Sequence, residues 1–436
     1  MKFAWTGLLV VFAALGAMAD GAAWEFSRQT VIQRWPWSRK VDVMFCARVV
    51  DGAGTRCRAA HVALKVKGVA VPESELDTAW ILGEGYQTIV WNPAETGYPA
   101  ELTSADLAVE VLEDVKDVGY LTIDLETGTR AYKPLSFSNE VNAANSPYKT
   151  THMAFRYIPS TISGDWRAQM DKTSFKMGSD GTRTDIGIIQ TDKDREGRAD
   201  VTLTKDFFFG VFPVTGQQYK LLGGTTTFGD DQAVQKLNYD TIRGPDGTNK
   251  VDGVDGRYCF PKSKEVKADS PIGRLRKLTG LMFDLPTEAQ WEYAARAGSE
   301  GEYFFPDTVT GQQNVLNELA NYGYNQNPTP VGRKRPNAWG IYDLIGCCHQ
   351  WTTTCGKLKS TDAYIKNQEA TDPIGLTPNA GTGVMRFLRG SHNGTGGGST
   401  QCRVQRFAYR MVQPSNVVTD GGEGKLAGFR LALTLE

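Results

Sequence analysis

The sequence predicts two domains in a row, a small all-β sandwich and then a larger domain that contains helices. Three observations favour this organisation. Apolar and polar residues alternate with a period of two between residues 24 and 130, which is typical of strands. Residues 131–150 are rich in Ser, Asn, Pro and Ala and indicate a linker. Two capping-box patterns that predict helices lie beyond that linker, and a chain of 436 residues favours more than one domain.

The first domain, residues 24–130, is expected to consist of antiparallel strands with one buried face. The alternation is clearest at residues 41–45, 61–66 and 106–111, with turn residues between these stretches. No residue in this region suggests catalysis. An immunoglobulin- or fibronectin-like accessory sandwich is therefore our interpretation.

Two cysteines of this domain are predicted to face each other. Asp51-Gly52 is a hairpin signal, and a two-residue turn there would place Cys46 opposite Cys57 on neighbouring strands. The register makes them a hydrogen-bonded pair, which has the wider Cα separation. A cross-strand disulfide is the expectation.

The N-terminus has the pattern of a signal peptide at residues 1–19. Lys2 supplies a positive charge, residues 4–16 are largely apolar, and Ala17-Met18-Ala19 fits a small-x-small cleavage site. We expect cleavage after Ala19 and export to the periplasm or the extracellular space, with a retained N-terminal anchor as the alternative. No other stretch is long enough for a transmembrane helix, so an integral membrane protein is not expected.

The charge balance and the cysteine and histidine content limit the functions that the chain is expected to have. The chain has 48 basic and 49 acidic residues and a net charge of −1, which gives no reason to expect nucleic acid as a partner. Seven cysteines in an exported protein favour disulfides, and the odd count leaves at least one thiol without an intramolecular partner. The four histidines lack metal-ligand spacing, so an iron centre is not expected.

Local signals predict two helices in the second domain. Thr287 and Gln290 form a capping-box pattern, and Gly298 is placed to end that helix. Thr215 and Gln218 form a second capping box, which predicts a helix through the residues that follow.

The segment 285–298 resembles the central helix of the sulfatase-modifying-factor family, also called formylglycine-generating enzymes. Further landmarks of that family follow in its order along residues 151–436. They lie at residues 175–179, 201–215, 320–322, 330–332, 336–344, 388–391 and 428–430. The resemblance implies a compact α+β domain with the C-type-lectin-like fold of this family.

The resemblance also implies an activity. Two cysteines of the family bind one copper(I) ion, which suits soft thiolate ligands, and O₂ then oxidises a substrate cysteine to formylglycine. The second family cysteine matches Cys402, whereas the first falls at about Gly394. Ser391 and Arg410 would line the site. The implied partner is an exported protein or peptide such as a sulfatase.

Other interpretations of these residues stay open. Cys402 is also consistent with a buried small residue or half of a disulfide. Arg406 and Arg410 line a pocket for a peptide or anion, or they form structural ion pairs. A second sulfur for copper would have to come from Cys347, Cys348 or Cys355. The alternative function is a catalytically silent lectin-like module that presents loops, including the Gly-rich residues 394–398, to a peptide or glycan.

The resemblance implies calcium as well. In the main calcium loop of the family, here residues 342–351, carboxylate, amide and backbone oxygens surround the ion. Gln350 replaces the charged ligand of that loop, so a weak site is expected. The other family site lacks its acidic loop here. The residues expected to contribute are Asp343, Gly346, the carbonyl of Cys348 and Gln350 in the first site, and Asn321 and Tyr322 in the second.

Overall fold

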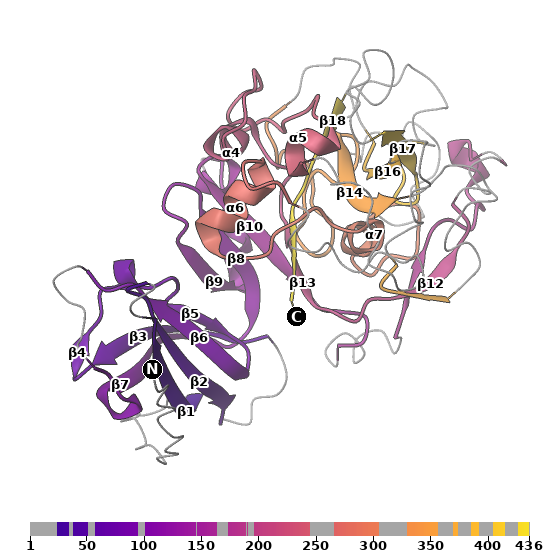
Figure 1. Cartoon of the computed structure of the whole chain (residues 1–436). Coiled ribbons are helices and arrows are strands. Elements are labelled where there is room, and N and C mark those ends of the chain that lie inside the picture. Colours follow the sequence, from indigo (N-terminus) through magenta and orange to yellow (C-terminus); the bar gives the residue numbers. More distant parts are fainter. Residues whose placement is uncertain are drawn as a thin grey trace, which may run out of the picture. The chain divides into compact units, whose positions relative to one another are not determined.

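The structure is a computed structural model (Figure 1), and it describes most of the chain in two units. The described residues are 24–34, 38–50, 57–94, 101–144, 146–163, 173–188, 190, 196–244, 266–304, 329–355, 369–373, 385–391, 404–414 and 426–435. One unit comprises Met1–Val118 and Arg130–Pro134, and the other comprises Gly119–Thr129 and Leu135–Glu436. The expected signal peptide lies outside the described residues.

The first unit is built from antiparallel strands in two sheets. One sheet has the order β1-β2-β6, and in the other β3 pairs with β4, β5 and β7. Side chains from both sheets form one hydrophobic cluster, in which Val43 and Phe45 of β2 accompany Val62 and Leu64 of β3. The strands of these two sheets are β1 (Trp24–Gln33), β2 (Val41–Val49), β3 (Ala59–Val66), β4 (Val69–Ala70), β5 (Trp80–Leu82), β6 (Gly85–Trp91) and β7 (Leu107–Val115). The unit also contains β9 (Arg130–Pro134), which belongs to neither of these sheets, and the 3₁₀ turns η1 (Glu73–Glu75) and η2 (Ser104–Asp106). The strands expected from the alternation are present, and the immunoglobulin- or fibronectin-like assignment stays a prediction.

The predicted pairing of Cys46 with Cys57 is wrong. β2 pairs with β1 and β6 rather than with β3, so Cys46 lies opposite Ser27 on one side and Tyr86 on the other. The apolar faces of β2 and β3 pack in one core instead of lying edge to edge, so these consecutive strands belong to different sheets. Cys46 is a free thiol. The expected turn at residues 51–52 lies outside the described residues.

The structure divides the chain at a different point from the expected boundary at residue 130. β8 (Val118–Asp124) pairs with β10 (His152–Ile158), so residues 119–129 group with the second unit. Six consecutive residues of β8 are buried, which is the pattern of a strand covered on both faces. The expected linker at 131–150 holds β9, η3 (Leu135–Phe137), α1 (Ser138–Val141) and η4 (Pro147–Lys149).

The second unit is a mixed α+β, sheet-rich structure with few helices among its described residues (Figure 1). In one sheet β19, β13, β10 and β8 follow one another. β11, β12 and β15 form a second sheet, and β17, β16, β14 and β18 form a third. The bounds are β11 (Phe175–Met177), β12 (Ala199–Thr202), β13 (Phe207–Gly210), β14 (His349–Cys355), β15 (Glu369–Thr371), β16 (Met385–Arg389), β17 (Met411–Pro414), β18 (Ala427–Gly428), β19 (Ala432–Thr434), η5 (Thr184–Ile186), α4 (Gly216–Leu221), α5 (Tyr239–Arg243), α6 (Pro271–Thr279) and α7 (Glu288–Arg296).

Helix α7 confirms the predicted capping box. The Thr287 hydroxyl accepts from the Gln290 backbone N–H at 3.1 Å, and the Gln290 side chain accepts from the Thr287 N–H at 3.0 Å. The helix ends at Arg296, and its C-cap is Ala297, which has φ 46° and lies one residue before the expected Gly298. The second predicted box, at Thr215 and Gln218, caps α4.

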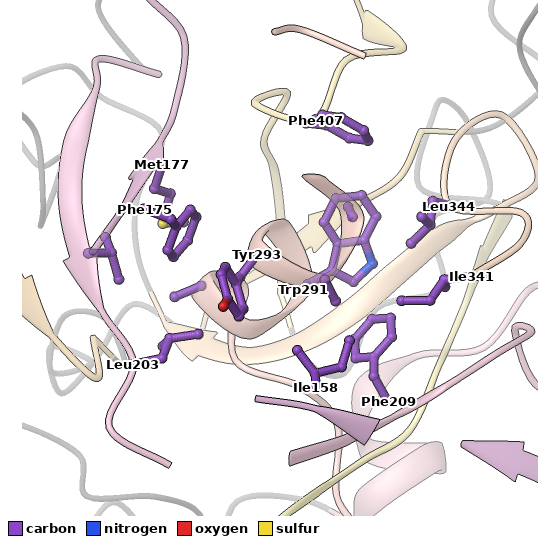
Figure 2. Packing of buried hydrophobic residues seen from close by; sticks show 14 of the residues in the cluster. Ile158, Phe175, Met177, Leu203, Phe209, Trp291, Tyr293, Ile341, Leu344 and Phe407 are labelled. Carbon is purple, nitrogen blue, oxygen red and sulfur yellow. The ribbon is translucent and has the colours of Figure 1, made fainter. Parts of the chain in front are cut away.

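The core of the second unit surrounds α7. Figure 2 shows Trp291 and Tyr293 of this helix between side chains from β11 on one side and from residues 341–344 on the other. All nine residues of α7 are buried, so the helix lies inside the unit with neighbours on every face. Within the described residues, no helix has the length and apolar character needed to span a membrane.

Candidate functional site

The described chain carries a strained serine at the end of β16, where the sequence placed the catalytic site. Ser391 has φ 53° and is 1% exposed, and its Oγ has no hydrogen-bond partner among the described residues. A left-handed backbone is uncommon for serine, and a buried hydroxyl normally has a partner. Strain combined with an unsatisfied polar group is typical of functional positions.

Because residue 390 is a glycine, the chain after β16 can lie close to the backbone of Leu344 and Cys348. Gly390 has φ 90°, and a Cβ there would lie 2.7 Å from the carbonyl oxygen of Leu344 and 3.3 Å from that of Cys348. The N–H of Gly346 donates to the Gly390 carbonyl at 2.9 Å. The residue before Ser391 is therefore fixed against the loop in which calcium ligands were predicted.

Arg389, two residues before Ser391, forms buried ion pairs with α7. Its guanidinium contacts Glu288 at 3.1 Å and also pairs with Glu292, and all three side chains are fully buried. The same guanidinium lies over the Trp291 ring, 5.3 Å from its centroid. Helix α7 thereby determines where β16 ends.

Arg406 and Arg410 also form buried ion pairs, as one of the two interpretations expected. Arg410 Nε lies 2.7 Å from Glu288 Oε1. Arg406 lies 2.8 Å from a carboxylate oxygen of Glu196 and 3.1 Å from one of Glu302. The segment 404–410 is thus anchored by charge to α7 and its surroundings, and the role of Arg410 in lining a site stays a prediction.

The ion pairs control the protonation of Glu292. Burial by itself raises the pKa of this carboxyl, but Arg389, Arg296 and Arg410 lower it, and the resulting pKa is about 2. Arg296 lies 2.7 Å from the Glu292 carboxylate, one helical turn along α7. Because a buried charge without its partner is strongly destabilising, these groups act as one unit.

The described part of the predicted calcium loop makes internal hydrogen bonds. Asp343 is buried with φ 52°, its carboxylate accepts from the Gly332 N–H at 2.6 Å, and burial raises its pKa. The Gln350 side-chain oxygen accepts from Trp291 Nε1 at 2.8 Å and from Arg430 Nε at 3.1 Å. The structure therefore brings Asp343 and Gln350 together, with Gln350 Nε2 donating to the Asp343 carbonyl at 3.2 Å.

Arg430 is the residue of this region that the sequence reasoning missed. It was noted only as the end of the Gly428-Phe429-Arg430 landmark, yet its guanidinium lies at the centre of the loop and is 0% exposed. The signal in the sequence was Gln350, an amide where the family has a carboxylate, because an amide oxygen still accepts from an arginine.

Several predicted site residues lie outside the described residues: Cys402, Gly394, Asn321 and Tyr322. Of the cysteines considered as a second copper ligand, Cys347, Cys348 and Cys355 are all buried. A hydrogen bond with Cys348, together with burial, raises the pKa of the Cys347 thiol, which disfavours the thiolate that a metal needs. The described part of the chain contains no cluster of three His, Cys, Asp or Glu side chains suited to a metal ion.

The chain has similarity to characterised proteins over its second unit. The family described as "Sulfatase-modifying factor enzyme 1-like domain" (FGE-sulfatase) matches residues 170–435. Formylglycine-generating enzyme from Streptomyces coelicolor is 34% identical over 161 residues, which are 34% of this chain and 46% of that protein. The Mycobacterium tuberculosis enzyme is 37% identical over 121 residues, covering 24% and 40%.

Two further similarities have lower sequence identity. Chaperone protein LppX of Paenibacillus barcinonensis is 27% identical over 194 residues, which are 38% of this chain and 68% of that protein. The solved structure of PvdO from Pseudomonas aeruginosa aligns with a TM-score of 0.44 at 20% identity, covering 65% of this chain and 94% of that one. The chain spans less than half of each of the two formylglycine-generating enzymes named above.

Proposed function

Because the chain belongs to the sulfatase-modifying factor family, as the resemblance predicted, we propose that it is an exported protein of the formylglycine-generating type. Its reaction would be the copper- and O₂-dependent oxidation of a cysteine to formylglycine in an exported protein substrate such as a sulfatase. The family match over residues 170–435 and the relatives named above support this assignment.

The geometry at Ser391 is the observation that carries the proposal. A buried hydroxyl with no partner among the described residues is available to hydrogen-bond a substrate group, and its residue has a left-handed backbone. Arg389 and Arg410, which lie on either side of residues 392–403 in the sequence, both pair with Glu288. These residues position the site, and the hydroxyl of Ser391 is the group offered to the substrate.

Copper would be held by Cys402. Copper(I), when bound, would supply one electron to activate O₂. The sequence provides one of the two family thiolates, because Gly394 stands at the other position. The fit of the donor set is therefore partial, since two thiolates make the preferred environment for this ion.

Gly394 favours a second candidate function. A member of the family with one thiolate in place of two is suited to bind a peptide or a glycan without oxidising it. In that case the Gly-rich residues 394–398 would contribute to recognition of the peptide or glycan.

One titration distinguishes the two functions. The reduced full-length chain is titrated with Cu(I), and aldehyde formation is followed by mass spectrometry on a cysteine-containing peptide. The catalytic function predicts one tightly bound copper and an aldehyde product, both lost in Cys402→Ala and retained in the control Cys46→Ala. Absence of copper binding, or a disulfide at Cys402 in thiol mapping, would rule out catalysis and leave the binding module.

A further inference from the structure

The turn at residues 342–351 does not fit the calcium ion that the family resemblance implies. Calcium takes six to eight oxygen ligands whose lone pairs converge on the ion. Both side-chain groups expected as calcium ligands are instead engaged by protein donors. Gln350 Oε1 accepts two hydrogen bonds, from Trp291 and Arg430, and Asp343 uses a carboxylate oxygen for the Gly332 N–H.

The guanidinium of Arg430 donates hydrogen bonds to backbone oxygens of the same turn. Its Nη2 donates to the Tyr342 carbonyl at 2.6 Å and to the Asp343 carbonyl at 3.2 Å. Its Nη1 donates to the carbonyls of Gly210 and Val211, each at 2.7 Å. Among the described residues, all its hydrogen bonds go to neutral oxygens, which are the ligand type that a loop offers to a cation.

A second buried cation lies near Asp343. Lys149 is 8% exposed, and its ammonium donates to the carbonyls of Asn142 and Ala143 at 3.3 and 3.2 Å. The ammonium also lies over the Phe212 ring, 5.5 Å from the centroid. Lys149 and Arg430 both act electrostatically on the Asp343 carboxylate. A divalent ion at Asp343 would therefore meet two positive charges in a medium of low dielectric constant.

We propose that the hydrogen bonds from Arg430, Trp291 and the Gly332 N–H leave residues 342–351 without a calcium site, so that the second unit folds without calcium there. The guanidinium connects the end of β13, the turn before β14 and β14 itself through the hydrogen bonds given above. This inference does not depend on the proposed catalytic function, because it concerns a different group of residues and needs no turnover.

Calcium binding is measured first, by equilibrium dialysis of the native full-length chain and of the double variant Asp343→Asn, Gln350→Ala. The proposal predicts that the two proteins bind the same amount of calcium, whether none or an amount held elsewhere in the chain. Calcium that binds to the native chain and is lost in the double variant would overturn it. This measurement does not require a variant of Arg430 to fold.

Thermal unfolding in calcium and in EGTA then tests the guanidinium. Arg430→Met is expected to lower Tm by about 5 to 10 °C, because buried oxygens lose their donors. In the double variant Arg430→Met, Gln350→Glu, calcium is expected to restore part of the lost Tm. The new carboxylate and the carbonyls that Arg430 no longer bonds then face the space that the guanidinium has left.

Arg156→Met is the matched control. Arg156 also donates to backbone carbonyls, those of Gly119, Tyr157 and Trp339, which lie outside the turn. An unchanged Tm in Arg430→Met, or no calcium response in the double variant, would overturn the proposal.

Discussion

Ser391 and Asp343 share an uncommon local state, because each is buried with a left-handed backbone. Ser391 has φ 53° and Asp343 has φ 52°. The two side chains destabilise the fold in different ways. Ser391 leaves a hydroxyl without a partner among the described residues, whereas Asp343 buries an ionisable carboxyl whose pKa is raised by that burial.

Asp343→Asn is predicted to stabilise the protein at pH 7, because burial disfavours the ionised carboxyl. The ionised form is disfavoured in the fold, so the penalty is fully present above the raised folded pKa and disappears as pH falls below the ordinary value of 3.8. Asparagine also tolerates a left-handed backbone better than most residues. Denaturant unfolding at pH 7 and at pH 3 should show a gain only at the higher pH. Asp284→Asn is the control and should destabilise, because Asp284 pairs with Arg243 and Arg276.

Ser391→Ala is predicted to reduce aldehyde formation on a cysteine peptide at least tenfold without lowering Tm. The variant removes a buried hydroxyl that has no partner among the described residues, so stability should be unchanged or slightly higher. Activity and Tm are measured on the same preparation. A drop in Tm that matches the loss of activity would instead indicate a structural role for this hydroxyl.

At the scale of elements, α7 is the part of the second unit on which most others depend. Its Glu288 and Glu292 pair with Arg389 of β16 and with Arg410 of the following segment. Its Trp291 donates to Gln350 of β14 at 2.8 Å. A single helix with no exposed face thus fixes three segments that are far apart in sequence.

Glu292→Gln is predicted to destabilise the protein by about 3 kcal/mol at pH 7, because the buried arginines lose part of their countercharge. The folded pKa of Glu292 is about 2 and its ordinary value is 4.5. Its contribution is therefore present above pH 4.5 and is lost as pH falls from 4.5 towards 2. Urea unfolding at pH 7 and at pH 2.5 should show a smaller difference between native and variant at the lower pH. The exposed Glu126→Gln should show no difference at either pH.

At the scale of the whole molecule, each unit has its own hydrophobic interior. The cluster of the first unit contains Val43, and a separate cluster of the second unit contains Trp291. A domain with its own core is able to unfold as its own cooperative unit.

Differential scanning calorimetry is therefore predicted to show two transitions. Val43→Ala should lower one of them, by a destabilisation of about 2 to 3 kcal/mol, and Trp291→Phe should lower the other. The cavity left by each substitution acts only on the core that contains it. A single transition that moves with both substitutions would contradict this prediction.

Local chemistry explains what could be predicted from the sequence. The capping box at Thr287 and Gln290 depends on residues three apart, and the alternation at residues 41–45 depends on the period of a strand. Each signal depends on residues within one element, and both elements are present in the structure. The order of landmarks along residues 151–436 indicated the family for the same reason, because each landmark is a short local pattern.

Contacts between distant segments were decided only by the tertiary structure. β2 and β3 are consecutive in sequence, but burying their apolar faces places them in different sheets, which separates Cys46 and Cys57. Arg430 became a central residue because the carbonyls of residues 210, 211, 342 and 343 converge on it from two other segments. The sequence by itself determined the two capped helices, the strands at residues 41–45, 61–66 and 106–111 and the family, since short-range patterns specify them. Which side chains meet in the interior was set by packing and by the need to satisfy most buried charges and hydrogen-bonding groups, which no local pattern encodes.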